Sequence, residues 1–246
     1  EMITSVSVRE KGGLIIASHH GINFFDPKNG RLERVLEPEK NQPGNRFNDG
    51  ASDRQGRFWV GTMQNNITAD AKNLPMETNS GSLYRVDPDL SFHCMETGIM
   101  VSNTVCWSPD NSIFYFTDTV TGVIRAYDFN EQSGLISNSR PLLKGPEGSG
   151  YPDGSTVDAE GGIWSCRWEG GSVIRFLPSG EVDLIIEVPV PRVTSCTFGG
   201  ENLDMLFLTT ARWDMTEEEL AQNPEAGGLF MVKSGFKGLP DARFGG

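Results

Sequence analysis

The sequence lacks the features that define several large classes of protein. No apolar stretch approaches the 18 or more residues of a membrane-spanning helix. Lys and Arg number 21 against 33 Asp and Glu, which gives a net charge of -12. Because nucleic acids and anionic membranes attract basic surfaces, this balance argues against both as partners. The expected partner is a small molecule, bound by a monomer or a small homo-oligomer.

Cysteine and histidine are also scarce. The four cysteines form no CxxC pair, and Cys106, Cys166 and Cys196 lie in or beside strand-like runs, so we predict buried free thiols rather than disulfides. Free thiols are typical of a reducing compartment, which favours a cytoplasmic location. No signal peptide is visible, but the chain begins at Glu1 rather than Met, so a leader stays an open alternative. With three histidines and no Gly-x-Ser-x-Gly motif, a serine hydrolase is unsupported.

The sequence does contain a plan that repeats along its length. Four segments each carry a polar residue just before a small turn cluster and a strand-like run. These polar residues are Asn48, Asn103, Asp153 and Ser195, which lie 55, 50 and 42 residues apart. Repetition on this scale is typical of solenoids and propellers. The four segments are 45–50 (NRFNDG), 101–105 (VSNTV), 151–155 (YPDGS) and 193–197 (VTSCT).

A second series of strand-like runs follows the first, and each run starts at a glycine. In two repeats the glycine lies 19 or 18 residues after the polar residue, whereas the other two have separations of 33 and 32. The longer pair contains insertions near residues 64–80 and 213–226, and insertions often lie on loops over the binding face. The second insertion predicts a short helix within 215–222, capped by Thr216 or Asp214. The glycines are Gly21, Gly81, Gly122, Gly171 and Gly227.

Residues 4–30 form one further unit, in which Ser5 stands 43 residues before Asn48. Five units without a linker predict a single all-β domain over residues 1–246, built from four-stranded antiparallel blades. An open β-solenoid would show shorter and more regular periods than these. We therefore expect a β-propeller, with five of its blades represented in the chain.

Equivalent places in a closed repeat converge on one axis, so Asn48, Asn103 and Asp153 are expected to form an oxygen-rich cup. Amide and carboxylate oxygens suit one divalent cation, with Ca²⁺, Mg²⁺ or Mn²⁺ favoured over Zn²⁺. Taken singly, the strings around Asn48 and Asp153 are better explained as turns. Their matching repeat positions, with Asn103 between them, favour the metal site.

The same residues resemble the regucalcin–gluconolactonase (senescence marker protein-like) family of six-bladed propellers, which are metal-dependent sugar lactonases and related esterases. The resemblance covers essentially the whole chain. Each string by itself is weak evidence for the family, whereas the order and spacing of all the strings together are specific to it. Besides 45–50, the strings are 56–63 (GRFWVGTM), 107–110 (WSPD), 152–154 (PDG), 158–161 (DAEG), 194–200 (TSCTFGG) and 224–230 (PEAGGLF).

The resemblance implies a role for each polar residue of the cup. Asn103 and Asp153 would be metal ligands, with Asn48 beside them as a direct or water-mediated ligand, and Asp153 would also be the catalytic base. Arg46 would hold substrate hydroxyls, for which its five donors are suited, and a salt bridge to Asp49 is its plain structural alternative. Asn66 takes the place of a substrate-contacting Glu in some members, which makes it a substrate-binding candidate.

Two departures limit what the resemblance implies. The family's first blade carries a Glu in a Gly-Glu-Gly-Pro type of motif that completes the metal site, and no such motif is present here. Glu1 and Glu10 stand in other contexts, so the chain is expected to begin at the second of six blades. The second departure is the uncharged string 64–66 (QNN), which leaves the choice of substrate open.

These observations predict a metal-dependent hydrolase that opens a sugar lactone, such as glucono- or arabinonolactone, to the aldonic acid. The metal would polarise the lactone carbonyl, and water would attack after deprotonation by Asp153 or activation by the metal itself. One alternative is a related metal-dependent esterase or phosphotriesterase, and another is a non-catalytic calcium-binding propeller. Trp168 and Trp213 lie just beyond repeat strands and are candidates for the pocket wall.

Overall fold

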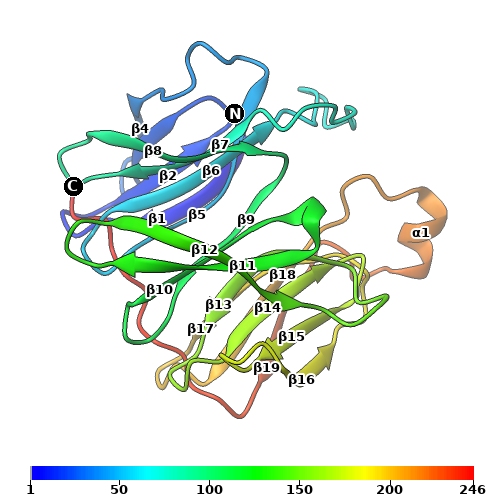
Figure 1. The fold of residues 1–246 in the computed structure, drawn as a ribbon. Coiled ribbons are helices and arrows are strands. Elements are labelled where there is room, and N and C mark those ends of the chain that lie inside the picture. The colour runs from blue at the N-terminus through cyan, green and yellow to red at the C-terminus, as the bar shows by residue number, and fades with distance from the viewer. Residues whose placement is uncertain (1) are drawn as a thin grey trace.

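The computed structural model describes residues 2–246, whose regular structure is almost entirely β-strand. Antiparallel pairing groups the strands into five sheets, which follow one another in sequence order (Figure 1). We number them blade 1 (β1–β4), blade 2 (β5–β8), blade 3 (β9–β12), blade 4 (β13–β16) and blade 5 (β17–β19). The strands are β1 (Ile3–Val8), β2 (Leu14–Ser18), β3 (Ile22–Asp26), β4 (Arg31–Leu36), β5 (Asn45–Ser52), β6 (Phe58–Gln64), β7 (Gly81–Val86), β8 (Phe92–Ile99), β9 (Ser102–Trp107), β10 (Ile113–Asp118), β11 (Val123–Asn130), β12 (Leu135–Lys144), β13 (Tyr151–Val157), β14 (Ile163–Trp168), β15 (Ser172–Phe176), β16 (Val182–Glu187), β17 (Val193–Gly199), β18 (Met205–Thr210) and β19 (Leu229–Lys233).

The first strand of each blade is the innermost one. Strands β1, β5, β9, β13 and β17 lie against one another in that order, whereas β17 and β1 form no comparably extensive contact within residues 2–246. The predicted all-β propeller architecture, with five blades in this chain, is therefore confirmed. Within the same residues no helix has the length and apolar character needed to cross a membrane.

Blade 5 differs from the prediction of four-stranded blades, because it has three strands within the described residues. The chain leaves β19 as an extended tail rather than as a fourth strand. The predicted helix is present as α1 (Glu217–Gln222), between β18 and β19. Its N-cap is Thr216, whose hydroxyl accepts from the backbone N–H of Glu219 while the Glu219 carboxylate accepts from the Thr216 backbone, a reciprocal capping box.

Apolar side chains form four clusters, one between each pair of neighbouring blades. Between blades 2 and 3, Trp59, Phe114 and Phe116 are fully buried, and burying each large side chain contributes on the order of 2–3 kcal/mol. The close approach of these blades requires a glycine at one position. A Cβ atom on Gly61 would lie 2.3 Å from the Cβ of Ser102, too close for any side chain.

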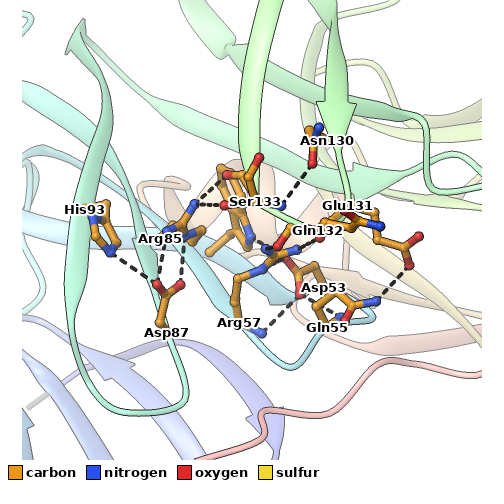
Figure 2. A network of polar contacts seen from close by, with 12 residues as sticks. Asp53, Gln55, Arg57, Arg85, Asp87, His93, Asn130, Glu131, Gln132 and Ser133 are labelled. Atoms are coloured by element: carbon orange, nitrogen blue, oxygen red, sulfur yellow. Dashed lines mark hydrogen bonds and ion pairs between the residues drawn. The ribbon is translucent and has the colours of Figure 1, made fainter.

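Two arginines of blade 2 tie it to the turn between β11 and β12 of blade 3 (Figure 2). Arg57 and Arg85 donate to backbone carbonyls within residues 131–134, with a shortest distance of 2.7 Å for each. Each guanidinium also pairs with a carboxylate, Arg57 with Asp53 at 2.6 Å and Arg85 with Asp87 at 2.8 Å. The charges of both arginines are thereby compensated while their other donors hold the neighbouring blade.

The C-terminal tail returns from blade 5 to blade 1 (Figure 1, red). It first pairs with blade 4, where the N–H of Ala159 donates to the carbonyl of Lys237 at 2.8 Å. At its end Phe244 is fully buried in the cluster between blades 1 and 2. The N–H of Phe244 donates to the carbonyl of Val8, and its own carbonyl accepts from Glu10, both at 2.8 Å. The tail therefore links blade 5, by way of blade 4, to the start of the ring.

Candidate functional site

A pocket of about 800 Å³ lies where the innermost strands of all five blades converge. Each of these strands contributes a polar residue to its lining, namely Thr4, Asn48, Asn103, Asp153 and Ser195. Arg46 and Asn66 line the same pocket. The structure thus brings together every residue that the sequence proposed for the metal, the base and the substrate.

A local irregularity in each inner strand explains how these side chains reach the axis. The pairing register shifts at the pocket end of every blade, for example between Phe47 and Gly50 in β5 and between Pro152 and Ser155 in β13. Such bulges re-aim side chains and are frequent beside active sites. The turn-like strings around Asn48 and Asp153 therefore lie in bulged parts of strands. The same irregular backbone accounts for their turn residues and brings the two side chains to the pocket.

Arg46 is held by several bonds within the pocket wall. Its Nε and Nη2 both donate to Oδ1 of Asn66, at 3.0 and 2.9 Å. Its Nη1 donates to the carbonyl of Phe47 at 2.9 Å and to Oδ1 of Asn48 at 2.8 Å. Since a guanidinium has five N–H groups, one on Nη2 is left without a bond to the described residues. The alternative of a salt bridge from Arg46 to Asp49 is not what the structure forms.

The two asparagines of the cup are joined in a chain of hydrogen bonds. Nδ2 of Asn48 donates to Oδ1 of Asn103 at 3.1 Å and to the carbonyl of Ser102 at 2.8 Å. Nδ2 of Asn103 donates to the hydroxyl of Thr119 at 2.8 Å, and that hydroxyl donates to the carbonyl of Pro152 at 2.8 Å. This chain fixes Asn103 relative to the strand that carries Asp153.

The pocket contains two carboxylates in an unfavourable environment for charge. Burial raises the pKa of Asp153 well above its usual range, and the charge of Asp49 raises it further, whereas the Gly154 N–H and Arg46 act in the opposite direction. Burial also raises the pKa of Asp49 to about 6, although the N–H of Gly50 and two backbone N–H groups of β9 lower it. A bound cation would stabilise the charged form of both carboxylates.

The Arg46 guanidinium keeps its charge despite its surroundings. Burial lowers its pKa to about 10, and the carboxylate of Asp153 opposes that shift. Arg46 is therefore a cation at neutral pH, placed in the same pocket as the cup.

The donors of the cup suit the kind of metal ion that the sequence implies. Among residues 2–246, no group of three or more His, Cys, Asp or Glu side chains is arranged to hold a metal ion. A cation would need amide oxygen as well as carboxylate, and Asn103 with Asp153 supplies that mixture, which Ca²⁺ and Mg²⁺ accept. Asn48 turns its oxygen to Arg46 and its amide nitrogen to Asn103. That orientation fits the water-mediated role better than direct ligation.

Asp49 and Thr119 also line the pocket and were missed by the sequence reasoning. Strict alternation would turn Asp49 away from the face that Asn48 occupies, but the bulge between Phe47 and Gly50 brings both to the pocket. The signal was available, since an Asn-Asp-Gly string within a strand predicts irregular backbone. Thr119 lies just after β10 and carried no such signal.

The ring of antiparallel blades around a pocket lined by amide and carboxylate oxygens defines the molecule as a β-propeller with a central ligand site. Comparison with known families identifies it further: residues 1–212 match the family described as SMP-30/gluconolactonase/LRE-like region. The chain belongs to this family.

Individual relatives agree with that assignment. The chain is 36% identical to human regucalcin and 34% identical to rabbit regucalcin, covering 99% of this chain and 81% of each relative. Its fold matches the structure of a calcium-binding protein, regucalcin, from Agrobacterium tumefaciens with a TM-score of 0.89, at 30% identity over 98% of this chain and 79% of the other. A gluconolactonase from Xanthomonas campestris has a TM-score of 0.69 at 24% identity over 84% of this chain and 68% of the other, which is a likeness of fold.

Proposed function

We propose that the protein is a metal-dependent lactonase that opens an aldonolactone of a pentose or hexose to the aldonic acid. The observation that supports this most is the convergence of Asn103, Asp153 and Arg46 in one pocket. A site that only stored a cation would gain nothing from a guanidinium beside it, because like charges repel. Membership of a family named for gluconolactonase supports the same class of reaction.

Each side chain has a definite task in this reaction. Arg46 would donate its remaining Nη2–H to an oxygen of the lactone, held in place by Asn66 and Asn48. Asp153 would accept a proton from the attacking water, since its carboxylate has few protein donors. That proton would pass to the ring oxygen as the acyl–oxygen bond breaks, which leaves the hydroxy acid. When bound, a divalent cation would supply Lewis-acid polarisation of the lactone carbonyl.

The test is proton release from a panel of sugar lactones, followed in a pH-stat. The protein would be treated with a chelator and assayed before and after addition of Ca²⁺, Mg²⁺, Mn²⁺ or Zn²⁺ in turn. We expect metal-restored acid release from one or a few aldonolactones. A folded, six-bladed protein that released no acid from any lactone with any of the metals would contradict the proposal.

We also infer that the complete propeller has six blades. The outward side chains of β1 and β19 support this, because Ile3 and Val6 on one and Leu229 and Met231 on the other are 52–69% exposed. Apolar faces of this kind are normally covered in propellers. The sixth blade would complete the ring between β17 and β1 and would carry the remaining protein ligand of the metal.

A further inference from the structure

One residue of the inner strands has a backbone conformation that its side chain disfavours. Thr104 in β9 has a φ of 56°, in the left-handed region, and no other described residue of β1, β5, β9, β13 or β17 has a positive φ. That region is rare for a β-branched residue and is normally taken by glycine. Such strain persists only where the surrounding structure imposes it, and it is concentrated at functional sites.

The unusual φ belongs to the bulge of β9. In the pairing of β9 with β10, two residues, Thr104 and Val105, stand opposite the single residue Phe116. In a bulge of the kind whose first residue is left-handed, that residue is usually glycine. The bulges of β5 and β13 contain the pocket residue itself, whereas the bulge of β9 begins directly after Asn103. The bend at Thr104 therefore adjoins the side chain proposed as a metal ligand.

The left-handed bend at Thr104 directs two backbone donors to one carboxylate. In a regular strand, successive N–H groups point to opposite sides of the strand. At this bulge, the N–H groups of Thr104 and Val105 both donate to the carboxylate of Asp49 in blade 2. Successive N–H groups that converge in this way form a nest, which is a backbone site for an anion. The conformation of Thr104 therefore fixes the position of Asp49 in the pocket.

The side chain of Thr104 reaches the neighbour on the other side, blade 4. Its hydroxyl donates to the backbone carbonyl of Asp153 at 2.7 Å. The same oxygen lies 2.8 Å from the hydroxyl of Ser155, and since its one proton is used on the carbonyl, Ser155 is the donor of that bond. Thr104 is fully buried, so bulk water does not compete for either bond.

We propose that Thr104 is a positioning residue for the metal site, which sets the distance between Asn103 and Asp153 through its strained backbone and its hydroxyl. The inference rests on the metal-dependent function proposed above. Asn103 directly precedes Thr104 in the chain, and the Thr104 hydroxyl holds Asp153, so one buried residue relates the ligands of two blades. The Thr119 hydroxyl supplies a second link between the same two strands. Residues that orient metal ligands typically contribute about ten- to hundredfold to metal affinity.

The experiment compares three substitutions at Thr104 in the complete six-bladed protein. Thr104→Val keeps the β-branched shape and removes the hydroxyl. Thr104→Ser keeps the hydroxyl, whereas Thr104→Gly removes it and accepts the positive φ without strain. Thr117→Val is the matched control, because Thr117 is equally buried, donates at 2.7 Å to the carbonyl of Val123 and does not line the pocket.

Calorimetric titration of Ca²⁺ and thermal unfolding of the metal-free protein give two readouts besides turnover. We expect Thr104→Val and Thr104→Gly to bind Ca²⁺ about tenfold more weakly than wild type, and Thr104→Ser to bind it as wild type does. Thr104→Gly should have a higher Tm than Thr104→Val, because only valine keeps the strain. Thr117→Val should lose stability but no Ca²⁺ affinity. Affinity that follows the Thr104 hydroxyl rather than the Tm distinguishes positioning from a purely structural role.

The two readouts separate the possible failures. Equal Ca²⁺ affinity in wild type, Thr104→Val and Thr104→Gly would overturn the positioning role while leaving the metal site in place. An equal loss of affinity in Thr117→Val would attribute the effect to general destabilisation and would also overturn that role. If folded wild type bound none of the four ions of the lactone assay, the metal-dependent function would be wrong, and the role of Thr104 would fall with it.

Discussion

Blades 2 and 4 each carry two aspartates along one inner strand, and the two kinds of aspartate are bonded very differently. Asp49 in β5 and Asp153 in β13 line the pocket. Asp53 and Asp158 follow the same two strands directly and are 1% and 0% exposed. The same blade therefore presents one carboxylate to the axis and buries another at the end of its inner strand.

The buried pair has a complete and nearly identical set of partners. Asp53 accepts from two backbone N–H groups, from the indole N–H of Trp59 and from Nε of Arg57, at 2.6–3.1 Å. Asp158 accepts from two backbone N–H groups, from Trp164 and from Nε of an arginine, at 2.7–2.9 Å. Buried polar groups in folded proteins are normally satisfied in this way.

The pocket pair lacks the arginine and indole donors of that set, although three backbone N–H groups donate to Asp49. Among the described residues, the Asp153 carboxylate has the Gly154 N–H as its donor, and burial raises the pKa of both Asp153 and Asp49. A carboxylate with four donors has no capacity left for a ligand, whereas one with few donors gains from binding a cation or a proton. The comparison therefore separates the aspartates that hold the blades together from those proposed to act on a ligand.

The largest expected effect is that of Asp153→Asn on turnover. The substitution keeps the shape of the side chain but removes the charge and the basic site, so we expect kcat/KM for the preferred lactone to fall about 10³-fold. Thermal unfolding of the metal-free variant should not be lowered, because burial already disfavours the charge. Steady-state kinetics and calorimetry would measure the two quantities, and an active variant would remove Asp153 from the mechanism.

Asp158→Asn should have the opposite effects, lowering stability while leaving turnover unchanged. An amide nitrogen would face the indole and guanidinium donors of Trp164 and Arg175, so we expect the free energy of unfolding to fall by about 3 kcal/mol. The folded variant should keep its kcat, since Asp158 lies outside the pocket. Denaturant unfolding and assays below the midpoint would test this. Loss of kcat in folded protein would show that the buried structural aspartates also contribute to turnover, which would contradict the division into two kinds.

Asp49→Asn tests the environment of the pocket aspartates through the pH dependence of thermal stability. In metal-free protein, burial raises the pKa of Asp49 from 3.8 to about 6, so the folded state binds the proton more tightly than the unfolded state. This carboxyl therefore lowers stability as pH rises from about 4 through 6. Because Asn does not titrate, the Tm of the variant minus that of wild type should increase over this range and level off above pH 7. A difference that did not change with pH would contradict the assigned environment.

Arg46→Lys should produce the smallest of these effects. Lysine keeps the positive charge but cannot bond to Asn66 with two nitrogens as the guanidinium does. We expect KM for the lactone to rise about tenfold, while metal affinity stays unchanged. A variant with wild-type KM would show that Arg46 does not hold the substrate.

The repeat spacing was sufficient to predict the inner strands and the blades, because apolar alternation and turn residues recur once in every blade. The outer strands β4, β8, β12 and β16 were harder to place, since much of their length is exposed and apolar alternation is weak. The end of the tail could not be predicted, because Phe244 belongs to no repeat.

Within the site, the repeat positions predicted which residues meet but not how they are oriented. Asn48 was expected to be a direct or water-mediated metal ligand, and the sequence did not indicate that its oxygen accepts from Arg46. Asp49 was missed because a bulge breaks the alternation rule. The contact of Ala71 and Asn73 with Trp213 and Asp214 joins segments of different blades, for which a single sequence contains no signal.

The most direct test of the account is a calorimetric titration of Ca²⁺ into chelator-treated wild type, Asp153→Asn and Asp158→Asn at a temperature where all three are folded. We predict saturable binding of one ion by wild type and by Asp158→Asn, with no comparable binding by Asp153→Asn. Equal binding by all three, or loss of binding in Asp158→Asn alone, would contradict the claim that the sparsely bonded carboxylate at the axis is the one that holds the metal.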